Sequence, residues 1–206
     1  MDLLNYLLNT YGYNEPFFTQ EISFKEYSQP WIYKELNRLC EEGKLIRYDK
    51  GVYYIPKDTP LGKSALDPRK IITKKYIQNG EEVVGYYSGN TLLNLLNLST
   101  QMPNTVEIYT NNEKSKIREV RVGKQRVALR RARTPITKEN SAVLQFLELM
   151  NFADAAFLNE EKKEKISAFI KKNKINRAKV AEYAPVFPDK VMRNLVESGV
   201  IYSVAR

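Results

Sequence analysis

The feature that most constrains the fold is a helix-and-hairpin pattern over residues 28–55 of the 206-residue chain. Between Ser28, a typical helix cap, and Gly43, a typical helix end, apolar residues recur at i, i+4, i+7 and i+8, on one helical face. They are Ile32, Leu36, Leu39 and Cys40. Two alternating runs then flank Asp49-Lys50-Gly51, which predicts a two-stranded hairpin over residues 45–55.

Two shorter helices are expected before this pattern. Residues 2–10 place leucines on one stripe, and Tyr11-Gly12 ends that helix. Thr19 is expected to cap a short second helix that buries Ile22. Three helices followed by a two-stranded ribbon is the order of a winged helix-turn-helix, a DNA-binding fold whose last helix enters the major groove.

The polar face of the third predicted helix carries candidate DNA contacts. Arg and Lys can bind guanine, Asn and Gln can bind adenine, and Tyr hydroxyls commonly hold phosphates. The candidates are Gln29, Tyr33, Lys34, Asn37 and Arg38, with Lys50 at the hairpin tip as a phosphate contact. An ordinary solvent-exposed helix carries the same residue types, and residues 1–58 hold 7 basic and 9 acidic side chains, which favours that alternative.

The positive charge of the chain is concentrated after this segment. The formal net charge is +9, and residues 59–140 contain 15 basic against 7 acidic side chains. An excess of this kind favours polyanionic partners, nucleic acid above all. The strongest candidates for a basic surface, in DNA binding or another role, are Lys116, Arg118, Arg121, Lys124, Arg126, Arg130 and Arg131.

Most of these residues lie in a predicted hairpin, with strands over 117–122 and 125–130 and a turn at Gly123-Lys124. Alternate residues of a strand point to opposite faces of a sheet, and in these two strands basic and apolar residues occur on both faces. We therefore expect at least one arginine to pair with a carboxylate or to lie at a sheet edge, where charge blocks aggregation. Whether the hairpin faces an anion or only solvent stays open.

The chain is predicted to be α+β, with an N-terminal winged helix-turn-helix followed by a mixed α/β domain and a helical C-terminus. A Pro- and Gly-containing linker over 56–62 sets the boundary at 58/59, and the expected domains are 1–58, 59–152 and 153–206. In the middle segment we expect helices over 67–78 and 142–150, strands over 83–87 and 105–110, and a helix after Ser88. The last of these buries Leu92, Leu93, Leu95, Leu96 and Leu98.

Three helices are predicted in the C-terminal segment, over 160–172, 176–184 and 188–198. They can form a small core from Ala178, Val180, Ala181, Val191, Leu195, Val196 and Val200. The segment is either a bundle with its own core, or a lid that packs on the middle segment.

The residue counts exclude several function classes. The chain has no histidine and one cysteine, which excludes His-based catalysis, His-ligated metals and an internal disulfide. We expect no catalytic residues, no metal and no cofactor. The Gly85-x-x-Ser88-Gly89 loop could cradle a phosphate, but it lacks the lysine and spacing of a nucleotide-binding loop, so a helix cap with close packing is the preferred interpretation. No apolar stretch approaches the roughly 20 residues of a membrane span, and a cytoplasmic protein is expected.

Two parts of the chain resemble one known family. The first is the run from Tyr33 to Arg47 together with Lys50-Gly51-Val52-Tyr53-Tyr54-Ile55-Pro56. The second runs from Gly85 through Asn94 and Leu98-Ser99-Thr100-Gln101-Met102-Pro103, and then over Val106–Asn112. Together they are similar to the AbiEi-type antitoxins of type IV toxin–antitoxin (abortive infection) systems, over roughly residues 1–150.

The resemblance implies a function in two parts. The protein would repress its own operon by binding inverted repeats in double-stranded operator DNA. It would also counteract a nucleotidyltransferase-like toxin, with or without direct contact, and it would not be an enzyme. The main alternative is a stand-alone winged-helix transcription factor whose C-terminal part dimerises or senses a ligand; a third is a nucleic-acid-processing enzyme that uses the 85–89 loop.

Overall fold

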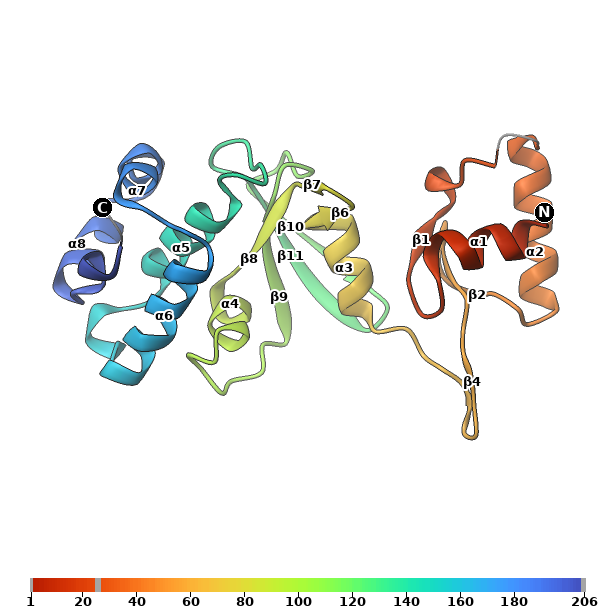
Figure 1. Cartoon of the computed structure of the whole chain (residues 1–206), viewed down its shortest axis with the longest axis horizontal. Helices are drawn as coiled ribbons and strands as arrows, with labels where there is room; N and C mark the ends of the chain where they lie inside the picture. The colour runs from red at the N-terminus through yellow and green to blue at the C-terminus, as the bar shows by residue number, and fades with distance from the viewer. Residues whose placement is uncertain (1, 25–26, 205–206) are drawn as a thin grey trace. The chain divides into compact units, whose positions relative to one another are not determined.

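The computed structural model describes residues 2–24 and 27–204, and its fold is mixed α and β, as predicted (Figure 1). The chain forms two compact units, Met1–Lys74 and Lys75–Arg206. The division lies inside helix α3 (Pro68–Tyr76), so the predicted boundary at 58/59 falls within the first unit. The first part of α3 is held there by its lysines: Lys74 Nζ lies 2.7 Å from a Glu21 carboxylate oxygen, and Lys70 donates to the Asn14 carbonyl.

The two α-helices of the first unit that precede α3 have the predicted positions. Helix α1 (Leu3–Tyr11) is capped by the Asp2 carboxylate, which accepts from the Asn5 N–H at 2.8 Å, and it ends at Gly12 with φ +79°. Helix α2 (Gln29–Glu41) follows Ser28 and buries the predicted apolar face. Leucines and isoleucines from both helices form one core with Phe17 and Tyr53, and Cys40 packs against it.

The predicted hairpin is also present. Strands β2 (Ile46–Asp49) and β3 (Val52–Tyr54) pair antiparallel, and β1 (Phe17–Phe18) adds to the other edge of β3. The turn between β2 and β3 contains Gly51, whose φ of +72° is a conformation that glycine adopts without strain.

The predicted second helix is wrong in extent and in its cap. A single 3-10 turn occupies Thr19–Glu21, and Phe18, whose N–H is bound by the Glu21 carboxylate, is its N-cap residue. Thr19 is the first residue of this turn and is buried; its hydroxyl donates to the Gly51 carbonyl, so it anchors the hairpin turn instead of capping a helix. Ile22 is buried, as predicted.

The predicted linker contains a further small hairpin. Strands β4 (Asp58–Thr59) and β5 (Gly62–Lys63) pair antiparallel around Pro60 and Leu61, and all four strand residues are exposed. The Pro and Gly residues of this stretch therefore form a tight turn.

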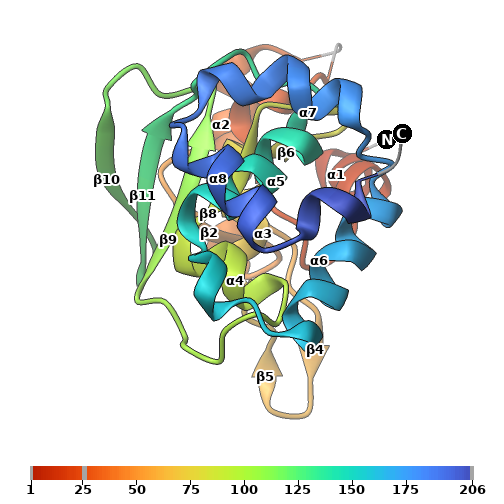
Figure 2. The ribbon, with the colours of Figure 1, turned by 90° about the vertical axis from the view of Figure 1, so that its left-hand side faces the viewer.

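The second unit is built on a four-stranded sheet, which Figure 2 shows beside its helices. The strands are β8 (Gly85–Ser88), β9 (Thr105–Thr110), β10 (Ile117–Val122) and β11 (Gln125–Arg131), in the order β10-β11-β9-β8. Strands β9 and β11 are parallel, and the other pairs are antiparallel. A two-stranded hairpin, β6 (Gln78–Asn79) and β7 (Glu82–Val83), precedes the sheet.

Helix α5 (Ser141–Phe152) is the centre of this unit and packs against β8 and two C-terminal helices (Figure 1). The helix is apolar around most of its circumference, and Phe146 and Leu147 are fully buried. The other helices are α4 (Gly89–Leu95), α6 (Glu160–Lys172), α7 (Arg177–Tyr183) and α8 (Lys190–Glu197), with 3-10 turns at Ala155–Phe157, Ala184–Val186 and Val200–Ser203.

The C-terminal helices share the core of α5, which favours the lid over a separate bundle. Val180, Val191, Leu195 and Val200 belong to the same buried cluster as Phe146. Three residues predicted in that core, Ala178, Ala181 and Val196, are exposed instead. Leu95 is exposed as well, because α4 ends there and covers the sheet only through Leu92 and its neighbours.

Candidate nucleic-acid interface

The polar face of α2 lies on the surface, opposite the buried residues Ile32, Leu36 and Leu39. All of its predicted contact residues are exposed: Gln29, Tyr33, Lys34, Asn37 and Arg38. Gln29, Tyr33 and Asn37 follow one another at i, i+4 and i+8, so they form a single row along the helix. We call this set the α2 polar face.

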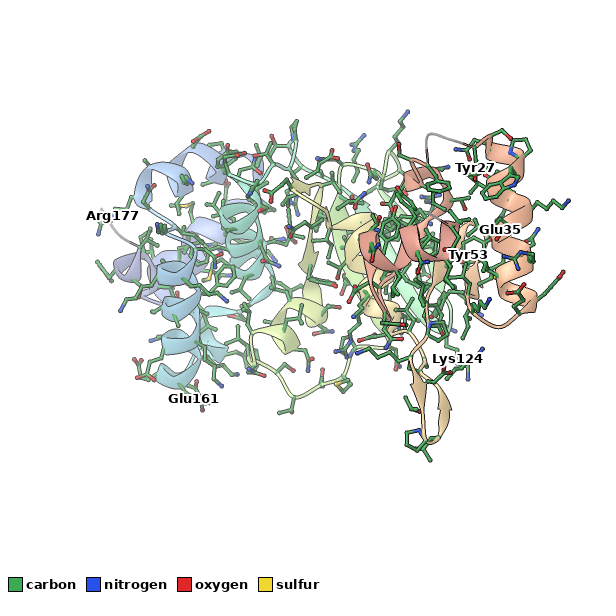
Figure 3. All side chains as sticks on the ribbon, turned by 45° about the vertical axis from the view of Figure 1, so that its right-hand side comes forward. Tyr27, Glu35, Tyr53, Lys124, Glu161 and Arg177 are labelled. Atoms are coloured by element: carbon green, nitrogen blue, oxygen red, sulfur yellow. The ribbon has the colours of Figure 1, made fainter. Side chains whose placement is uncertain are left out.

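Arg38 differs from the other members, because two nearby carboxylates bind it. Its guanidinium donates to Glu35, with Nε to Oε2 at 2.9 Å, and to Glu42. The hydrogen bond from Arg38 lowers the pKa of Glu35, and Lys44, followed by Arg38, lowers the pKa of Glu42. Figure 3 labels Glu35 on this helix. The Arg38 side chain is half exposed, and ion pairs at such positions hold a guanidinium only weakly.

Lys50 is exposed at the tip of the β2–β3 hairpin, where the prediction places it. Thr19 fixes the neighbouring residue, since its N–H and its hydroxyl both donate to the Gly51 carbonyl, at 3.0 and 3.1 Å. The lysine side chain therefore extends from a turn whose backbone is anchored to the rest of the unit.

The second predicted surface is the hairpin of β10 and β11, residues 117–131, which we call the basic hairpin. Strand β10 is the edge of the sheet. Two arginines of the hairpin are paired with carboxylates, which confirms the prediction of at least one such pair: Arg118 Nε lies 2.6 Å from Glu113, and Arg130 lies 3.2 Å from Glu107. These two residues are less available to a partner than their charges suggest.

The other predicted basic residues of this region make no side-chain hydrogen bond or ion pair with residues 2–24 or 27–204. They are Lys116, Arg121, Lys124, Arg126 and Arg131, all exposed. Arg121 and Arg126 are directly opposite each other across the strands. Like charges in that position destabilise a sheet, so an anion between them would be favoured. Lys124 occupies the turn and is labelled in Figure 3.

The 85–89 loop does not form an anion cradle. A Cβ at Gly89 would overlap the Glu107 carboxylate, and a Cβ at Gly85 would overlap the carbonyl oxygens of Tyr76 and Tyr109. The space beside Gly89 is therefore occupied by a side-chain carboxylate, and the space beside Gly85 by the backbone of two other segments. The glycines permit the close packing that was predicted, whereas Ser88, the N-cap residue of α4, makes no side-chain cap hydrogen bond.

Lys114 and Arg133 were not predicted as site residues, yet they line a pocket with Arg131 beyond the ends of β9 and β11. Both belong to residues 114–133, which hold nine basic side chains against one acidic one, so charge density was the available signal. Arg133 binds the buried Glu148, which lies on α5. This contact forms only when α5 packs on the sheet, so no local sequence pattern predicts it.

Arg133 is held in place from several sides. Its Nε lies 3.2 Å from a Glu148 oxygen, and its Nη2 donates to the Tyr109 hydroxyl at 3.2 Å. The guanidinium also lies over the rings of Tyr109 and Phe187, 5.3 and 5.0 Å from their centroids. Burial raises the pKa of Tyr109, which keeps its hydroxyl protonated. The Arg133 side chain is only 26% exposed, and these contacts together hold its guanidinium in one place.

Neither a group of metal-ligating side chains nor a helix that could cross a membrane occurs in the part of the chain that the structure describes. Residues 2–24 and 27–204 contain no group of three or more His, Cys, Asp or Glu side chains that could hold a metal ion. No helix in these two ranges has the length and apolar character needed to cross a membrane.

Comparisons with known proteins give a family without an assigned role. No curated protein matches the chain. Residues 17–178, from β1 to the start of α7, match the Family of unknown function (DUF6088). This match spans most of both units, and the chain therefore belongs to that family.

Proposed function

We propose that the chain is a winged-helix transcriptional regulator that binds operator DNA through the α2 polar face. The observation that carries this proposal is the row of Gln29, Tyr33 and Asn37, exposed on the outer side of a helix whose inner side is buried. A helix with such a row, followed by a hairpin with a lysine at its tip, has the parts that a winged helix uses on DNA.

The two surfaces would contribute differently. Asn and Gln side chains can bind adenine in the major groove and so select a sequence. The basic hairpin lacks a regular row of such groups, and its free cations would bind phosphates of any sequence. Specificity would thus come from the first unit, and salt-dependent affinity from the second.

The antitoxin part of the proposal rests on the AbiEi-type resemblance. On this proposal the chain represses its own operon at inverted repeats and counteracts a nucleotidyltransferase-like toxin, with or without direct contact. The protein would act in the cytoplasm and would not itself be an enzyme. A gene for such a toxin next to the gene for this chain supports the antitoxin role, and its absence favours the stand-alone regulator.

A gel-shift experiment tests DNA binding. Asn37→Ala is expected to weaken binding to the DNA upstream of the gene by ~1–3 kcal/mol and to relax the preference for one base. Arg38→Ala should weaken binding in the same direction. Arg177→Ala, which removes an exposed charge from α7, serves as the control.

Two results would count against the proposal. Equal losses for Asn37→Ala on operator and on random DNA would reassign this residue to backbone contacts. Unchanged binding in both α2 variants would remove α2 from the interface altogether.

The pocket beside Arg131 favours the stand-alone regulator in one respect. A regulator that senses a ligand needs a concave site outside its DNA-binding helix, and the second unit contains one.

A further inference from the structure

A pocket of about 500 Å³ lies beyond the carboxyl ends of the two parallel strands β9 and β11. The chain leaves both strands at this edge, through the segments 111–116 and 132–140. Ligands of open sheets commonly bind at the carboxyl ends of parallel strands, where such segments separate. The volume is within the range of small-molecule sites.

The walls of the pocket are fixed by hydrogen bonds between the two segments. The Asn111 side chain donates to the Ile136 carbonyl at 2.8 Å and accepts from the Ile136 N–H at 2.9 Å. The Ala132 N–H donates to the Thr110 carbonyl at 3.3 Å. These bonds join segment 132–140 to the last residue of β9 and to the residue that follows it, and so define one side of the pocket.

The charges that line the pocket are unbalanced. Glu113 is already engaged: one oxygen accepts from the Ser115 N–H at 2.8 Å and the other from Arg118 at 2.6 Å. Arg133 is paired with Glu148. Arg131 and Lys114 also line the pocket, and neither has a side-chain hydrogen bond or ion pair within residues 2–24 and 27–204. Two positive charges are therefore left for a ligand.

We infer that this pocket binds the phosphate group of a small phosphorylated molecule. A guanidinium binds phosphate through two parallel N–H bonds, a lysine adds a second charge, and the Thr134 hydroxyl in the wall can donate a further hydrogen bond. Arg133 adds a cation that Glu148 and two rings hold in place. The proposal does not depend on DNA binding by α2, so either can fail alone.

Isothermal titration calorimetry of the full chain tests the proposal, with inorganic phosphate and adenosine 5′-monophosphate as probes at constant ionic strength. We expect wild-type binding in the millimolar range or tighter, and a loss of about tenfold or more in Arg131→Gln and Lys114→Gln. The matched control is Arg126→Gln, which removes the same charge from the same strand at an exposed position outside the pocket. It should bind like the wild type.

Three results would overturn the assignment. The first is the absence of heat with either probe in the wild-type protein. The second is an equal loss in Arg126→Gln, which would mean that net charge alone attracts the anion. The third is a duplex oligonucleotide that binds less tightly to Arg131→Gln while both small probes bind this variant and the wild type equally, which would make the pocket a site for a nucleic-acid phosphate.

Discussion

The α2 polar face and the basic hairpin are both rich in polar groups, but the arginine on α2 is paired with carboxylates and most of the hairpin's basic residues are not. On α2, Arg38 is bound by Glu35 and Glu42, and residues 1–58 carry more acid than base. On the hairpin, Arg121, Lys124 and Arg126 have no carboxylate partner among the described residues. The first surface therefore presents hydrogen-bonding groups in a regular arrangement but attracts an anion only weakly. The second surface attracts anions strongly, but its groups have no such arrangement.

On the proposed function, this difference would make net charge alone a poor guide to the surface that selects a DNA sequence. On that function, a surface that distinguishes bases needs hydrogen-bonding groups in a regular row, such as Gln29, Tyr33 and Asn37. A surface that binds any phosphate gains from free cations. The two surfaces also belong to units with separate buried clusters, one around Leu36 and one around Phe146.

The largest expected effect comes from the core of the second unit. Phe146→Ala removes a fully buried ring from α5 and should lower the free energy of unfolding of this unit by about 3–5 kcal/mol. Helix α2 should keep its protection, because its buried residues belong to the other cluster. Hydrogen exchange followed by mass spectrometry measures both. An equal loss of protection in α2 would mean that the two surfaces belong to one cooperative unit.

Elements with strong local signals could be predicted from the sequence. The apolar spacing from Ile32 to Leu39, the turns at Gly51 and at Gly123-Lys124, and the strand-like run over 105–110 each specified a helix, a turn or a strand that the structure contains. Surface residues followed from these elements, since the side of α2 opposite its buried face has to be polar.

Long-range contacts could not be predicted in the same way. Thr19 is a residue type that commonly caps helices, but its hydroxyl is used by Gly51, a residue of the hairpin turn. In the sequence, Arg130 and Arg133 have no evident carboxylate partner. Pairing of β11 with β9 brings Glu107 to Arg130, and packing of α5 on the sheet brings Glu148 to Arg133. Pairings of this kind depend on the tertiary fold.

The next effect concerns the free cations of the basic hairpin. Replacing Arg121, Lys124 and Arg126 together by Gln should flatten the slope of log affinity against log salt by as much as about 2.7, at roughly 0.9 for each phosphate that is no longer neutralised. The control replaces Lys171, Lys172 and Arg177, which are exposed in the same unit. Fluorescence anisotropy at several salt concentrations gives the slopes. The same flattening in both triple variants would remove any special role of the hairpin.

The smallest effect tests whether acids restrain the α2 polar face. Glu35→Gln with Glu42→Gln frees Arg38 and removes two negative charges, so DNA affinity should rise severalfold. Stability should be nearly unchanged, because the guanidinium that both acids bind is half exposed. In an Arg38→Ala background the gain should shrink, which a double-mutant cycle measures.

The pH dependence sharpens this test. Arg38 and Lys44 hold the pKa values of Glu35 and Glu42 below the ordinary range, so both carboxylates keep their charge as the pH falls from 7 to 5. The stability that these pairs contribute is present above the ordinary carboxyl pKa and is lost only as the pH falls through the lowered values. Wild-type affinity at pH 5 should therefore stay below that of the double variant. A wild-type protein that matches the variant at pH 5 would show that the acids are already protonated there, and that Arg38 is not restrained in the way the structure indicates.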